Sequence, residues 1–123
     1  MDVRLTREGH DELVVHLRDG ADETTVSVPQ ARPGAESLMR ALDTALATGH
    51  GECFWPCTTG GHYWWMFKRD GAALELIVMW TRGGVATWEH VFRATASVDW
   101  IRGQIVEELH RIELPYRQAL DSP

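Results

Sequence analysis

The sequence predicts a single α+β domain built on a curved, mainly antiparallel sheet of about seven strands, with two amphipathic helices packed on one face. Its 123 residues are the length of one domain. Seven strand-length segments are separated by short turn-forming stretches, and two longer segments carry apolar residues at helical spacing. The expected order is three strands, a helix, four strands and a second helix (βββ-α-ββββ-α), all within one domain over residues 1–123.

The first part of the chain is expected to form a three-stranded meander. Apolar and polar side chains alternate over residues 2–7 and 12–18, which is the pattern of half-buried strands. A third strand over about 24–28 is stopped by Pro29, because proline cannot donate a hydrogen bond within a sheet. The turns between these segments are short, so successive strands should pair antiparallel.

Two amphipathic helices follow from the spacing of apolar residues. The first is expected over about 33–48, since Pro33 suits a first helical position and Gly49 suits a C-terminal stop. The second begins after Ser97, a good N-cap, and stops at Pro115. Its apolar stripe consists of Val98, Ile101, Ile105, Leu109 and Ile112. Residues 116–123 are expected to add a turn or to fray.

Between the helices, four more strands are expected over 51–57, 62–69, 73–81 and 85–95, joined by glycine-containing turns. The two central strands are apolar on both faces, whereas a sheet with one wet face alternates apolar and polar residues. Three arrangements could cover the second face. The sheet curls around a second core, it pairs with another copy of the chain, or it holds a ligand or a protein partner.

The charge balance limits the classes of partner. The net charge is −6 and the estimated pI is 5.4, which argues against nucleic acid and against anionic membrane surfaces. A basic protein or a cationic ligand remains compatible with this charge. The N-terminus shows no signal-peptide pattern, and the two cysteines are too few for a secreted disulfide framework. We therefore expect a cytoplasmic protein.

One run of residues has the side-chain types of a zinc site, namely His50, Cys53, Cys57 and His62. If Cys53 and Cys57 belong to one strand, however, their Cα atoms are about 13 Å apart at roughly 3.3 Å per residue. That distance is too long for two ligands of one metal ion or for a disulfide. We expect two structural cysteines, no metal and no cofactor.

The strand over 85–95 contains Trp88-Glu89-His90. Strand neighbours point to opposite faces, so Glu89 and His90 cannot act together as a catalytic pair. Simple alternation places His90 on one face with Trp88 and Phe92. Glu75 is a second carboxylate within an apolar strand, where it guards a sheet edge or anchors a cationic ligand.

Six tryptophans in so short a chain exceed the needs of one core, which indicates that at least one lies at a surface, pocket or interface. The main functional hypothesis is a non-enzymatic binding protein that engages a protein partner through the aromatic sheet surface of residues 62–92. In composition and element order the chain resembles bacterial immunity proteins and secretion chaperones, a resemblance that implies the same kind of role. The expected binding residues are Trp64, Trp65, Glu75, Trp80, Trp88 and His90.

Two alternatives remain at this stage. One is a small-molecule-binding domain or cofactor-free enzyme whose pocket is lined by Trp80, Trp88 and His90, with Glu75 or Glu89 as the charged group. The other is a homodimer that uses the second sheet face as its interface. The chain carries none of the common nucleophile, phosphate-loop or zinc-protease motifs, so we expect no catalytic residue.

Overall fold

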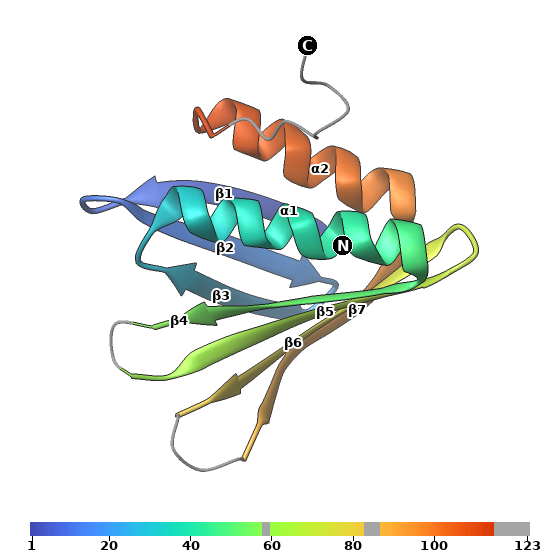
Figure 1. The fold of residues 1–123 in the computed structure, drawn as a ribbon, viewed down its shortest axis with the longest axis horizontal. Helices are drawn as coiled ribbons and strands as arrows, with labels where there is room; N and C mark the ends of the chain where they lie inside the picture. The colour runs from blue at the N-terminus through green and yellow to red at the C-terminus, as the bar shows by residue number, and fades with distance from the viewer. Residues whose placement is uncertain (58–59, 83–86, 115–123) are drawn as a thin grey trace.

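The computed structural model describes residues 1–57, 60–82 and 87–114, and shows two antiparallel sheets and two helices (Figure 1). The expected order of elements, βββ-α-ββββ-α, is confirmed. The elements are β1 (Asp2–Glu8), β2 (Glu12–Asp19), β3 (Asp22–Val28), α1 (Ala31–Thr48), β4 (His50–Pro56), β5 (His62–Asp70), β6 (Ala73–Thr81), β7 (Glu89–Ser97) and α2 (Val98–Arg111).

The seven strands form two sheets and not the one curved sheet that the sequence suggested. The first sheet has the order β1-β2-β3 and the second the order β4-β5-β6-β7, with every pair antiparallel. Helix α1 lies between β3 and β4 in the chain, where the other successive strands of each sheet are joined by short connections. No hairpin joins those two strands, and no hydrogen-bonded pairing between them is found in the described part of the chain. The tail at 116–123 and the start of the segment expected over 85–95 lie outside the described residues.

Both helices and the three-stranded sheet lie on the same side of the four-stranded sheet (Figure 1). Helix α1 packs on β4 and β5, while α2 packs mainly on β1 and also contacts β6 and β7. Leu5, Leu42, Trp55, Phe67 and Ile105 are completely or almost completely buried, and they come from three strands and both helices. One continuous core therefore fills the space between the helices and the two sheets.

Helix α1 lies directly against the backbone of β4. A Cβ atom at Gly51 would overlap the carbonyl oxygen of Ala41, so only glycine permits this approach. Further along β4, the indole Nε1 of Trp55 donates hydrogen bonds to the carbonyl oxygen of Gly34 and the hydroxyl of Ser37, both at 3.1 Å. These bonds hold the buried tryptophan against the first turns of α1 and replace the hydrogen bond to water that its indole N–H loses on burial.

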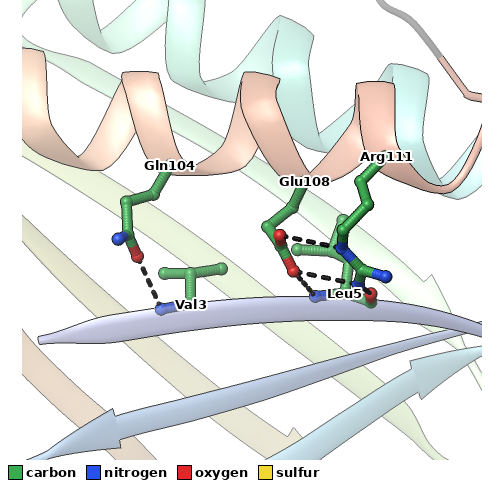
Figure 2. Close-up of polar contacts among 5 residues, drawn as sticks. All are labelled: Val3, Leu5, Gln104, Glu108 and Arg111. Carbon is green, nitrogen blue, oxygen red and sulfur yellow. Dashed lines mark hydrogen bonds and ion pairs between the residues drawn. The ribbon is translucent and has the colours of Figure 1, made fainter.

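The free edge of β1 is closed by side chains from α2 (Figure 2). Gln104 Oε1 accepts a hydrogen bond from the backbone N–H of Val3, and Glu108 Oε1 accepts one from the N–H of Leu5, each at 2.9 Å. Arg111 donates to the carbonyl oxygen of Leu5 and forms an ion pair with Glu108. Four helical residues rise about 6 Å and two strand residues span about 6.8 Å, so the two spacings match. The side chains thus replace the missing neighbouring strand.

Replacing Glu108 with alanine should lower the free energy of unfolding by about 1.5–3 kcal/mol, because a charged acceptor for the Leu5 N–H and the partner of Arg111 are both lost. Urea denaturation of the variant and the parent would measure this. The matched control is Glu107→Ala, since Glu107 is exposed on the same helix. Equal destabilisation by the two substitutions would contradict the edge-closing role.

The same contact predicts an acid dependence of stability. The hydrogen bond from Arg111 lowers the pKa of Glu108 below its ordinary value of 4.5. Because the folded protein then holds the proton less tightly than the unfolded chain, Glu108 stabilises the fold above pH 4.5, and this contribution disappears as the pH falls through the lowered pKa. Urea midpoints of the parent and Glu108→Gln should therefore converge below pH 4.5. A constant difference down to the lowest pH would refute this.

Candidate functional site

One face of the four-stranded sheet points away from both helices and from the three-stranded sheet (Figure 1). We call it the outward face. Strand alternation and the pairing register assign to it His50, Glu52, Phe54 and Pro56 of β4; His62, Trp64, Met66 and Lys68 of β5; Glu75, Ile77 and Met79 of β6; and His90, Arg93 and Thr95 of β7. No helix or strand within residues 1–57, 60–82 and 87–114 covers this face.

Three aromatic rings gather at one end of the outward face. The rings of Phe54 and Trp64 stack with centroids 5.6 Å apart, and Trp88, just before β7, lies 5.2 Å from Trp64 and 6.2 Å from Phe54. Phe54 is 50% exposed, and both tryptophans are half-buried. The Nε1 of Trp64 donates to Glu52 at 3.1 Å, which leaves the flat faces of the rings as the available surface. We call Phe54, Trp64 and Trp88 the aromatic cluster.

The opposite end of the outward face is charged. Glu75 forms an ion pair with Arg93, in which Glu75 Oε2 lies 2.5 Å from Arg93 Nη2. Lys68 is exposed beside Glu75 on the neighbouring strand. At the β4 edge, His50 lies 3.5 Å from Glu52. Met66 and Ile77 lie between the aromatic cluster and the row of Lys68 and Glu75, Met79 lies beside Trp64, and all three apolar residues are half-buried. The face therefore has an apolar centre with a polar margin, which is the composition of a protein interface.

Four of the expected binding residues meet on or beside this face. Trp64 and Trp88 belong to the aromatic cluster, Glu75 lies at the charged end, and His90 is exposed opposite Met79.

Trp65 lies on the other side of the sheet, with only 1% of its surface exposed. Its ring makes an edge contact with Trp55 at 5.0 Å and stacks with Phe67 at 6.4 Å. Trp65 is therefore part of the core.

Trp80 also lies on the core side of the sheet, because it pairs with Tyr63, which in turn pairs with Trp55. It forms a side-chain hydrogen bond with Cys57. A single pocket lined by Trp80, Trp88 and His90 is consequently not formed, since the last two residues belong to the outward face. Glu89 pairs with Trp80 and so shares its side of the sheet.

A β-bulge explains one error in the expected faces of β7. Val78 pairs with Phe92 and Met79 pairs with His90, so Val91 is left as an extra residue. The bulge reverses the alternation at this point. His90 thus points outward, near Trp88, while Phe92 is buried in the core and 3% exposed. Simple alternation had placed these two side chains on the same face.

The residues considered for zinc do not converge. His50 and His62 are exposed on the outward face, whereas Cys53 is buried on the core side, next to Ser37. Among the described residues, no group of three or more histidine, cysteine, aspartate or glutamate side chains is arranged to hold a metal ion. Both cysteines are free thiols. Burial raises the pKa of Cys53 to about 12 and also raises that of Cys57, which disfavours the nucleophilic thiolate in both.

Phe54 is absent from the residues expected at a binding site, although its place between Cys53 and Trp55 indicates that it faces away from the core. It also forms one wall of a hollow of about 380 Å³ beside the first turns of α1. Val28, Pro33, Ser37 and Pro56 contribute to the lining of this hollow. The hollow extends the apolar surface from the aromatic cluster past the β4 edge.

No family model matches the chain, and no curated protein or solved structure is significantly similar to it. In the described ranges, neither helix combines the length and apolar character needed to cross a membrane.

The two adjacent tryptophans of β5 should respond very differently to truncation. Trp65→Ala should cost about 3–5 kcal/mol of unfolding free energy, because it empties a large core site. Trp64→Ala should cost less than about 1.5 kcal/mol, since it removes only ring contacts at the surface. Guanidinium denaturation followed by far-UV circular dichroism measures both values. Similar losses from the two substitutions would mean that the outward face is not a free surface.

Proposed function

We propose that this chain is a non-enzymatic protein-interaction module that docks on a protein partner through the outward face of β4–β7. The observation that carries the proposal is the aromatic cluster, with Phe54 half exposed, on a sheet face that no other described element covers. Contiguous apolar patches with a polar margin on a protein surface are typical of docking sites.

The other sheet of the same molecule provides an internal comparison. The outward face of β1–β3 carries polar residues such as Arg4, His16 and Thr25, all exposed. This is the alternation that an antiparallel sheet shows when one face meets water. The corresponding positions of β5 and β6 carry Trp64, Met66, Ile77 and Met79. A face that stayed in water would not require these side chains, so their presence supports a covered face.

The residue types also suit protein recognition. Tryptophan, phenylalanine and methionine are enriched in the centres of interfaces, and tryptophan supplies many binding hot spots. The ring of Trp64 is already oriented by Phe54, Trp88 and the hydrogen bond to Glu52, so little freedom is lost on binding. The raised thiol pKa values and the separation of Trp80 from Trp88 and His90 favour binding over catalysis. An immunity- or chaperone-like role belongs to this class of function.

Site-specific photo-crosslinking tests the proposal. A photoreactive phenylalanine analogue would replace Met66 at the centre of the outward face, and in a matched control it would replace His16 on the outward face of β1–β3. In cells of the source organism, the probe at position 66 should give one discrete protein adduct that mass spectrometry identifies, and position 16 should not. Absence of an adduct at 66, or the same adduct from both positions, would contradict the proposal.

A further inference from the structure

We infer that the partner at the outward face is a second copy of this chain, related by a two-fold axis that runs along the strands between β5 and β6. The inference rests on the proposed function and specifies its partner. It comes from the order of side chains across the sheet, which the pairing register fixes. A two-fold interface brings the same patch of both copies together, so the patch must be complementary to itself.

The row of side chains across the middle of the face has this property. Register places Glu52 of β4 at one end, Met66 and Ile77 in the centre, and Arg93 of β7 at the other end. The proposed axis exchanges β4 with β7 and β5 with β6. Glu52 then lies opposite Arg93 of the second copy, and the reverse pair forms at the other end. The two apolar residues meet each other between these ion pairs.

The neighbouring rows match under the same operation. In the charged row, Lys68 lies opposite Glu75 of the second copy. In the aromatic row, Trp64 lies opposite Met79, a pairing in which the thioether sulfur contacts the ring face or edge favourably. A two-fold axis perpendicular to the strands would instead place the charged row against the aromatic end. It would bury Lys68 and Glu75 against Trp64 and Met79, with no opposite charge from the second copy, which is unfavourable.

The charge of the outward face also selects this partner. The face carries two carboxylates, Glu52 and Glu75, and two cationic side chains, Lys68 and Arg93. It is therefore balanced although the whole chain has a net charge of −6. A basic partner would gain little from a neutral surface, whereas a second copy of the same surface meets alternating charges of opposite sign.

The size of the face is compatible with a reversible dimer. Four strands about 4.8 Å apart and roughly 25 Å long give on the order of 500 Å² of flat area per copy. Side-chain relief increases this toward the roughly 800 Å² per partner of a standard interface. Two such sheets pack with strands within about 30° of each other, which keeps the rows approximately opposite one another.

The test uses a charge exchange across the sheet. Within one chain Glu52 and Arg93 are three strand spacings, about 14 Å, apart, so they do not contact each other. The two-fold axis forms each pair of positions 52 and 93 twice. In a homodimer of Glu52→Arg, both pairs therefore consist of two arginines. In a homodimer of Arg93→Glu, both pairs consist of two glutamates. An equimolar mixture of these two variants restores opposite charges at both positions of a heterodimer. Glu107→Arg on α2 is the matched control for a charge change at an exposed site.

Sedimentation equilibrium of the purified proteins gives the outcome. We expect the unmodified chain and Glu107→Arg to dimerise, each single exchange to raise the dimer dissociation constant about tenfold or more, and the mixture to recover a heterodimer. An unmodified chain that remains monomeric at several hundred micromolar overturns the inference, whether or not any variant folds. So does a mixture of folded variants that shows no heterodimer. A crosslinked adduct at position 66 of some other mass would leave the proposed function standing while this inference fails.

Discussion

Helix α1 lies directly on the backbone of β4 because position 51 is glycine, and much of the architecture depends on this close contact. It brings the first turns of α1 within reach of the Trp55 indole, which donates to Gly34 and Ser37. The helix then covers β4 and β5 from one side, and the three-stranded sheet and α2 complete the same side. The whole core is thereby built on one face of the four-stranded sheet.

The two sheets differ in what covers their edges and their faces. Helix α2 satisfies the free edge of β1 through Gln104 and Glu108, which removes a template for pairing with another chain. The outward face of β1–β3 is polar, as a wet face should be. The outward face of β4–β7 has an apolar centre and no cover from any described helix or strand. If two copies associate as proposed, they do so through that face, and its self-complementary rows of charge would determine the geometry.

Local patterns in the sequence predict most of the elements but not their assembly. Alternation and turn residues identify the strands, and the two-sided apolar character of β5 and β6 already indicates the unusual second face. The division into two sheets depends on contacts between distant segments, which alternation does not report. The bulge at Val91 shifts the alternation by one residue, so it separates His90 from Phe92. The assignment of Trp64 outward and Trp65 inward likewise requires the register of β5 with β4 and β6.

The most direct test of the account is methionine oxidation of the unmodified protein over a range of concentrations. Met66 and Met79 lie on the outward face, whereas Met39 is fully buried in the core and serves as an internal reference. If two copies cover this face, mild peroxide should oxidise Met66 and Met79 rapidly in dilute solution and slowly at high concentration, with Met39 protected throughout. Oxidation of Met66 and Met79 at the same rate at every concentration would contradict association through this face.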